Sequence, residues 1–298
     1  MISGNIVTAL KKSAQMGFLA SMRVKSYPWQ QVASTLNMDE RTIDLVDLGA
    51  APMPVNDPAV AQDYIEKTIQ VQAKEWITKV WISDNALKDD PSGGALLRKV
   101  QSAGDRFQQH INNRVFTVLN AGDGTTYGSA YDTQDFFDSD HVDLGASYTT
   151  AQDNEGALAL SLDNFNTSWI AAQKFRDDQG EFSGYNYDLV VVPPDLWSVA
   201  MNVTGNMQAM DTANREDNPF SGLLKPPISS PQLDTTAWYL IASSEQHKPL
   251  IVAMKEQPHL QDSWFDPDTT DGGRHYFKFY ARYEVFYGDW RLAYQGNT

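Results

Sequence analysis

The sequence predicts an α+β fold built around one long helix and one long strand. Hydrophobic residues make up 42% of the 298 positions and aromatic residues 11%, so the chain can bury a sizeable core. Residues 64–83 alternate between apolar and polar side chains, which is the period of a strand. Residues 94–120 carry an apolar stripe at the period of a helix. Many glycines, prolines and aromatic residues favour a mixed fold over a helical bundle.

Composition excludes several classes of protein. The formal net charge is -15, which argues against nucleic-acid binding by the body of the chain, because phosphate contacts require Lys and Arg. The chain has no cysteine, so disulfides, cysteine zinc sites and thiol catalysis are excluded. No apolar run of about 18 residues is present, and the first residues lack the pattern of a signal peptide. We therefore expect no membrane partner.

The first 38 residues are the basic part of an acidic chain. Their four charged side chains are all cations: Lys11, Lys12, Arg23 and Lys25. The remaining 260 residues carry -15 minus 4, or -19. One interpretation is a partner-seeking basic arm, whose removal (residues 1–25) would leave a folded subunit but impair assembly. The other is an ordinary amphipathic helix, because apolar residues recur every four positions at Ile6, Leu10, Ala14 and Phe18.

The strand period follows a loop. Residues 39–58 contain a glycine and three prolines, which prevent a stable helix. In the next segment one face carries Ile65, Ile69 and Val71, and the apolar face changes phase near Glu75, as at a bulge. A ribbon of this length could approach 65 Å, at about 3.3 Å per residue. We expect it to project and to contact another subunit through these three residues; the alternative is that both faces pack in a large sheet of the same chain.

The helical stripe of residues 94–120 would bury seven side chains: Leu96, Val100, Ala103, Phe107, Ile111, Val115 and Val118. At 1.5 Å per residue the helix would be near 40 Å long. We expect Leu96, Val100, Phe107, Ile111 and Val115 to form the core of the domain that it organises.

The rest of the chain alternates shorter elements. We expect a helix over residues 162–176 capped by Ser161 or Asp163, and a buried strand that ends at Pro193 and leads into a helix through Trp197 and Met201. Further strands are expected over residues 238–242, 249–255 and 276–287.

The sequence gives little support for a catalytic site or a metal site. The cluster of Asp138, Asp140 and His141 has the side chains of a divalent-metal site, but we interpret it as a solvated turn. The other histidines are scattered, and the acidic residues 262–271 lack the final glutamate of a calcium loop. We therefore predict no catalytic, cofactor-binding or metal-binding residue.

A resemblance to a known family depends on six fragments in a fixed order. They are Phe137-Asp-Ser-Asp-His141, Leu160-Ser-Leu-Asp-Asn-Phe165, Leu189-Val-Val-Val-Pro-Pro-Asp-Leu196, Ala237-Trp-Tyr-Leu240, Lys248-Pro-Leu-Ile251 and Gly288-Asp-Trp-Arg-Leu-Ala293. In this order and spacing the chain resembles the Mu-like major head subunit family of tailed bacteriophages.

The resemblance implies the Hong Kong 97-type capsid fold. It places an N-terminal arm at 1–40, an extended hairpin called the E-loop at 41–79, and a peripheral domain at 80–150 and 256–289 with its spine helix at about 94–120. The axial domain is expected at 151–255 and 290–298. The agreement with the basic segment, long ribbon and long helix read from the residues supports this architecture.

The implied function is that of a major capsid protein. Subunits would assemble in the host cytoplasm into hexamers and pentamers of an icosahedral shell around double-stranded DNA, as part of the virion. Portal, scaffolding and decoration proteins are the expected partners. The packaged DNA would lie close to the shell without sequence-specific contacts. An acidic surface would repel phosphate and let the genome slide, although acidic charge can also serve solubility alone. Because Met1 leads directly into the arm, a separate scaffold is expected.

Two other functions stay open. The first is the shell of a cargo-filled bacterial nanocompartment of the same fold, which genomic neighbours would distinguish from a phage head. The second is an acidic cytoplasmic hydrolase, suggested by the cluster at Asp138 to His141. Large uniform particles would favour a shell, whereas a monomer that binds a metal tightly would favour the hydrolase.

Overall fold

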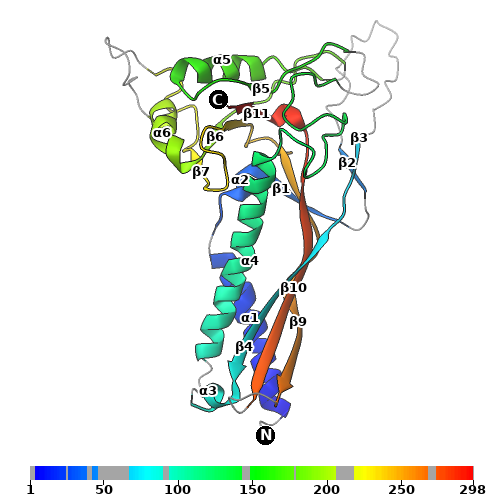
Figure 1. Ribbon diagram of the computed structural model, residues 1–298, viewed down its shortest axis with the longest axis vertical. Coiled ribbons are helices and arrows are strands. Elements are labelled where there is room, and N and C mark those ends of the chain that lie inside the picture. The colour runs from blue at the N-terminus through cyan, green and yellow to red at the C-terminus, as the bar shows by residue number, and fades with distance from the viewer. Residues whose placement is uncertain are drawn as a thin grey trace, which may run out of the picture.

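The computed structural model describes residues 4–24, 26–38, 42–45, 67–89, 94–142, 148–177, 179–205, 218–267 and 273–297. The molecule is tall, with a narrow lower body of two long helices beside a long sheet, and a broader upper body of shorter elements (Figure 1). The mixture of helices and sheets confirms the predicted α+β class.

Helices and strands alternate along the chain. The helices are α1 (Gly4–Val24), α2 (Trp29–Val32), α3 (Asp84–Asp89), α4 (Gly94–Asn120), α5 (Leu162–Ala172) and α6 (Trp197–Gly205), with 3-10 turns η1 (Pro194–Leu196) and η2 (Trp290–Leu292). The strands are β1 (Ala33–Asn37), β2 (Thr42–Leu45), β3 (Lys67–Gln70), β4 (Lys74–Ser83), β5 (Glu155–Gly156), β6 (Leu189–Val192), β7 (Ile228–Ser229), β8 (Trp238–Ile241), β9 (Leu250–Asp266), β10 (Arg274–Tyr287) and β11 (Ala293–Gly296).

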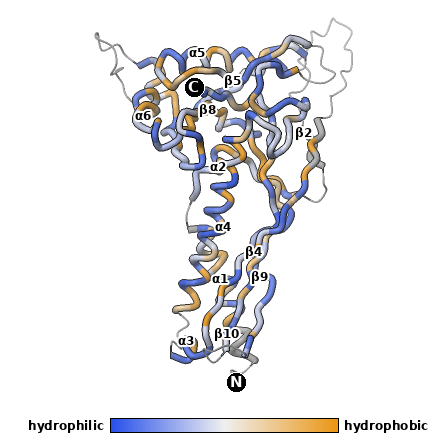
Figure 2. The backbone as a smooth tube through the Cα atoms, in the orientation of Figure 1, coloured by the Kyte–Doolittle hydropathy of each residue, from blue (hydrophilic) through white to orange (hydrophobic). Residues whose placement is uncertain are grey.

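The lower body pairs a four-stranded sheet with α1 and α4. The strand order is β1-β9-β10-β4, and β1 runs parallel to β9 while the other pairs are antiparallel. Phe18 of α1 stacks on Phe279 of β10 with ring centroids 4.2 Å apart and meets Phe107 of α4 edge-on at 5.7 Å. Hydrophobic and hydrophilic positions alternate along these elements (Figure 2), as expected where each has one buried face.

The upper body contains a five-stranded sheet in the order β5-β11-β8-β6-β7. All four residues of β6 and all four of β8 are buried, so these strands form its centre. Helix α5 begins after Ser161, whose side chain accepts a hydrogen bond from the Asn164 backbone N–H, and ends at Ala172, four residues before the predicted end.

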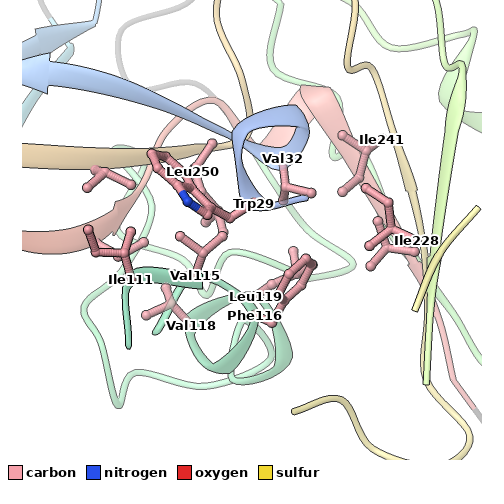
Figure 3. Close-up of a cluster of buried hydrophobic side chains, with 14 of the residues drawn as sticks. Trp29, Val32, Ile111, Val115, Phe116, Val118, Leu119, Ile228, Ile241 and Leu250 are labelled. Atoms are coloured by element: carbon pink, nitrogen blue, oxygen red, sulfur yellow. The ribbon is translucent and has the colours of Figure 1, made fainter. Parts of the chain in front are cut away.

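One hydrophobic core joins the two bodies. At the junction the last turns of α4 pack under α2, with Trp29 and Val32 above Val115 and Leu119 (Figure 3). Ile241 of the upper sheet and Leu250 of the lower sheet lie in the same cluster. The long helix therefore supports both sheets.

Two expectations about strands need correction. The ribbon expected over residues 64–83 is divided, because β3 ends at Gln70 and pairs with β2, whereas β4 begins at Lys74 and pairs with β10. The break lies just before the phase change expected near Glu75. The strand expected over residues 249–255 is β9, which continues to Asp266. Its outer half is almost entirely exposed or half-buried, so it lacks the apolar run by which a buried strand is recognised.

Candidate functional site

The apolar stripe of α4 faces the inside of the molecule. The five residues expected to form its core are all at most 4% exposed: Leu96, Val100, Phe107, Ile111 and Val115. They pack against α1 and the long sheet in one continuous cluster. The helix is therefore a structural support, and its other, polar face is the one available to partners.

The N-terminal segment is an amphipathic helix packed on its own chain. Ala14 is 1% exposed and Phe18 fully buried, while the cations Lys11, Lys12 and Arg23 lie on the exposed face; Lys25 lies outside the described residues. Because Phe18 fills the space between α4 and the sheet, we now expect deletion of residues 1–25 to destabilise the subunit as well as to impair assembly.

The base of the β2–β3 ribbon is held by a second, smaller core. Val71 is 2% exposed and packs with Met38, Ile251 and Ala253, and Ile69 lies half-buried against the same group. A side chain so enclosed has no surface left for a neighbour, so the expectation that Val71 contacts another subunit is corrected. Ile65 lies outside the described residues.

A buried carboxylate joins the first residue of β4 to α4 and β10. Glu284 lies 2.7 Å from Arg114 Nε and 2.9 Å from Lys74 Nζ. Burial acts to raise the pKa of Glu284, but the bonds from Arg114 and Lys74 outweigh it and hold this pKa below its usual value. The ionised pair fixes the start of β4, just after the ribbon, against the long helix.

Aromatic side chains reinforce the same corner. The Trp76 indole N–H donates to the Tyr283 carbonyl at 3.0 Å, and His110 Nδ1 lies 2.6 Å from the Tyr283 hydroxyl. Burial and the nearby Arg114 lower the pKa of His110, which favours the neutral ring. Sequence reasoning missed this corner because its members lie up to about 200 positions apart, and only a pairing of β4 with β10 would have indicated it.

The interpretation of residues 138–141 as a solvated turn is wrong for His141. This ring is fully buried and stacks on Trp290 with centroids 4.2 Å apart. Its Nδ1 lies 2.6 Å from Asp132 Oδ2 and its Nε2 lies 3.2 Å from Asn154 Oδ1, so each ring nitrogen lies within hydrogen-bonding distance of a polar side chain. The Asn154 amide in turn donates to the carbonyls of Phe136 and Trp290, and thereby ties this loop to the upper sheet.

The two aspartates of that cluster do remain at the surface. Asp140 is exposed, and its hydrogen bond with Asp138, together with their mutual repulsion, raises the pKa of Asp140. Within the described part of the chain, no group of three His, Asp or Glu side chains is placed to hold a metal ion. Among these same residues no helix has the length and apolar character needed to span a membrane.

The comparison with family models identifies the protein's family. The model of the phage capsid protein family matches residues 66–294, which include most of both bodies. The chain belongs to the phage capsid protein family. No curated protein matches the chain significantly. The family is a structural one, in agreement with the expectation that this capsid protein is not an enzyme.

Solved structures show the same fold. The capsid protein is similar to a chain of the bacteriophage JBD30 procapsid, with a TM-score of 0.58 and 20% identity over 100% of this chain and 76% of that one. It also resembles the capsid of Ralstonia phage GP4 (TM-score 0.54, 15% identity, 93% and 92% covered) and a virus-like particle from Pyrococcus furiosus (0.51, 9%, 96% and 98%). The fold is thus the Hong Kong 97-type capsid fold, and the function that of a major capsid protein that associates with itself into a shell.

Proposed function

We propose that this capsid protein is the major head subunit of a Mu-like tailed phage and that it forms hexamers and pentamers of an icosahedral shell around double-stranded DNA. The observation that carries the proposal is the family match, because it extends from the ribbon through both bodies to the last strand. The ordered fragments between Phe137 and Ala293 support the Mu-like assignment. Virions are where such a subunit functions, after assembly in the host cytoplasm.

The division of the chain into capsid regions is part of this proposal. Residues 1–40 correspond to the N-terminal arm, here including α1 folded on the body, and 41–79 to the E-loop. Since β4 pairs with β10 and Val71 is enclosed in the smaller core, only the part before Val71 is free to project. Residues 80–150 and 256–289, with α4 as spine helix, correspond to the peripheral domain, and 151–255 and 290–298 to the axial domain.

Further partners are proposed by analogy. Tailed-phage heads need a portal and a scaffold, and we expect both to bind this subunit. One similar structure is a JBD30 capsid decorated with minor capsid protein trimers, with a TM-score of 0.52 and 19% identity. A decoration protein is therefore a reasonable third partner for this shell.

A second candidate is a shell that encloses cargo other than a genome. The likeness to the virus-like particle from Pyrococcus furiosus favours it, since both chains are covered almost entirely. The shell-building surfaces would be the same in either case, and only the contents would differ.

Electron microscopy of the purified protein, expressed alone and together with its neighbouring genes, tests the proposal. Closed icosahedral particles with separate hexamers and pentamers, and nuclease-protected double-stranded DNA in particles from the source, are expected. Particles filled with a single protein would instead favour the second candidate. A monomer under all these conditions would contradict both.

A further inference from the structure

A hollow lies where the end of α4 meets the edge of the upper sheet. Its volume is about 300 Å³, and it is lined by Asp123, Glu155, Gly156, Ala157, Gln295 and Asn297. We call it the β5–β11 hollow, after the two strands that border it; both lie in the upper body, above the last turn of α4 (Figure 1). Its lining has two carboxylates and two side-chain amides, and no Lys, Arg or His.

The register of the upper sheet directs the polar side chains into this hollow. Gln295 of β11 pairs with Glu155 of β5 on one side and with Tyr239 of β8 on the other. Residues that pair directly point to the same face of a sheet. The Tyr239 hydroxyl donates to Asn120 Oδ1 at 3.3 Å, so this face looks toward the end of α4. Glu155 and Gln295 therefore point toward the loop after α4, which carries Asp123.

The Gln295 amide has an oxygen that needs a partner. The residue is 3% exposed, and its buried Oε1 accepts no hydrogen bond from any residue that the structure describes. A buried polar atom without a partner is costly, so such an oxygen favours a ligand that donates a hydrogen bond or carries positive charge. Rotation about the last side-chain bond exchanges the oxygen and nitrogen positions, so the oxygen can face the hollow.

The hollow also concentrates negative charge. Neither Asp123 nor Glu155 forms an ion pair with a cation in the described part of the chain. Burial raises the pKa of Glu155 above its usual value. Three aspartates add to this effect: Asp153, Asp138 and Asp123. A bound cation would relieve this repulsion.

The backbone around the hollow is held in place by hydrogen bonds. The Tyr294 hydroxyl donates to the Glu155 carbonyl at 3.0 Å, and the Asn297 N–H donates to the Gly156 carbonyl at 2.9 Å. A β-carbon at Gly156 would lie 2.6 Å from the Tyr294 hydroxyl oxygen, so the packing there is tight. A ligand would therefore meet oxygens that are already positioned, which lowers the entropy cost of binding.

The donor atoms select the kind of cation. Carboxylate and amide oxygens are the ligands of hard cations such as Ca²⁺ and Mg²⁺. Mg²⁺ requires a nearly octahedral set of ligands, whereas Ca²⁺ accepts about six to eight oxygens in flexible geometry. Oxygens from a loop and a sheet edge form an irregular set, and the volume of the hollow leaves room for water ligands. Because these oxygens lie on both sides of the hollow, a small ion can contact them together.

We propose that the β5–β11 hollow binds one Ca²⁺ ion, with Asp123, Glu155 and the Gln295 amide oxygen as its protein ligands. The ion would link the loop after α4 to the edge of the upper sheet. The site has only two acidic side chains, which agrees with the finding that no three His, Asp or Glu residues of the described chain gather around a metal position. With so few charged ligands the dissociation constant should be roughly 10⁻⁴ to 10⁻³ M. The inference concerns the single subunit and does not depend on shell building.

Calcium titration of the purified, unassembled subunit by calorimetry is the first test. Asp123→Asn with Glu155→Gln should weaken binding roughly tenfold or more, because both charged ligands are lost. The matched control is Asp163→Asn with Asp195→Asn, two exposed acids outside the hollow, which should bind as the wild type does. Both double variants lose two negative charges, so net charge cannot explain a difference between them. Equal affinities, or a wild type that binds no calcium at millimolar concentration, would overturn the proposal.

Gln295→Leu separates a ligand role from a packing role. Leucine fills a similar volume without an oxygen, and it removes a buried amide that has no partner for Oε1. Without calcium the variant should melt at or above the temperature of the wild type. Calcium should raise its melting temperature less than that of the wild type, and its calcium affinity should fall. A change in melting temperature with unchanged calcium affinity would show that Gln295 only packs, and would contradict the proposed ligand set.

Terbium luminescence tests the position of the ion. Tb³⁺ replaces Ca²⁺ at oxygen sites and emits when a nearby aromatic ring transfers its excitation, and Tyr239 lies beside Gln295 on the same face. The wild type and the control variant should show this emission, calcium should displace it, and the Asp123→Asn with Glu155→Gln variant should lose it. Emission that this variant retains would place the ion elsewhere. If neither ion binds, but this variant fails to form particles that the control forms, the hollow receives a Lys or Arg side chain of another protein and the calcium proposal is wrong.

Discussion

Glu284 is the residue on which three elements of the lower body converge. Its carboxylate comes from β10, Lys74 from β4 and Arg114 from α4. Since Glu284 is 4% exposed, losing its charge would leave Arg114 without its partner in a partly buried position. Removing one member of a buried ion pair costs more free energy than the intact pair contributes to stability, because the remaining charge stays buried without a partner.

We predict that Glu284→Gln lowers the free energy of unfolding by roughly 3 kcal/mol at pH 7. The pKa of Glu284 is lowered in the folded state, so its contribution is complete above the usual glutamate value of 4.5 and is lost as pH falls through the folded pKa. The gap between wild type and variant should therefore shrink below pH 4.5. Urea unfolding at a series of pH values measures this difference in unfolding free energy, and Glu181→Gln at an exposed position is the control. A difference that stays constant down to acid pH would contradict the ionised Glu284 pair.

Phe107 tests the buried stripe of α4. It is 4% exposed and meets Phe18 edge-on, so Phe107→Ala should lower the free energy of unfolding by about 3 to 5 kcal/mol through lost contacts and a cavity. Gln101→Ala, on the exposed face of the same helix, should change it by less than about 0.5 kcal/mol. Denaturant unfolding of both variants measures the two changes in free energy. Equal changes would contradict the burial of Phe107 in the apolar stripe of α4.

At the element scale, α1 is an integral layer of the lower body. The repeat of Leu10, Ala14 and Phe18 every four residues predicted its buried face, and the four cations suggested an arm. Both patterns are real, because the apolar face packs on α4 while Lys11 and Lys12 remain exposed. Net charge describes only the surface of a helix and does not reveal whether its other face is docked.

We predict that Phe18→Ala destabilises the subunit by about 3 to 5 kcal/mol, because the ring is stacked between α4 and β10. Met16 is 66% exposed two residues earlier, so Met16→Ala should leave the melting temperature of the subunit within about 2 °C. Thermal melts of both variants as unassembled subunits provide the comparison. A Phe18→Ala subunit as stable as the wild type would show that α1 does not support the fold.

Val71, at the base of the β2–β3 ribbon, tests whether this position supports the fold of the subunit or a contact between subunits. Val71→Asp would bury an unpaired carboxylate among Met38, Ile251 and Ala253, so it should destabilise the subunit by several kcal/mol instead of affecting assembly alone. Gln72→Asp places the same group on the neighbouring exposed position and should fold normally. Circular dichroism reports loss of folding and sedimentation reports loss of assembly. A Val71→Asp subunit that melts normally would support the earlier expectation that Val71 contacts another subunit.

The sequence predicted elements better than it predicted their partners. The stripe of α4 was recognisable because seven apolar residues follow the helix period with no interruption. The burial of His141 was not, since its polar neighbours Asp138 and Asp140 are typical of a turn, and its partners Asn154 and Trp290 are distant in the chain. The division of the ribbon was hidden for a similar reason: strand period persists across residues 64–83, but β3 and β4 have different partners.

At the scale of the whole molecule, the shared core makes the two bodies one folding unit. The buried cluster continues from Phe18 in α1 through Leu119 at the end of α4 to Trp238 in the upper sheet. We predict a single calorimetric transition for the unassembled subunit, with equal calorimetric and van't Hoff enthalpies, because neither body can lose its packing alone. Two resolved transitions would show that the bodies unfold independently.

The parallel pairing of β1 with β9 also has a consequence for biosynthesis. Ala33 lies beside Leu250, 217 positions later in the chain (250 minus 33), so the β1 edge of the long sheet cannot form until most of the polypeptide has left the ribosome. At about 5 to 20 residues per second, the first strand waits roughly 10 to 45 s for its neighbour. During that interval the hydrogen-bonding edge of β1 and the part of α1 that packs on β9 and β10 are open to chaperones or to other nascent chains. Head production in an infected cell should therefore depend on chaperone supply when translation is fastest, and chains truncated before residue 250 should accumulate as aggregates and not as shells.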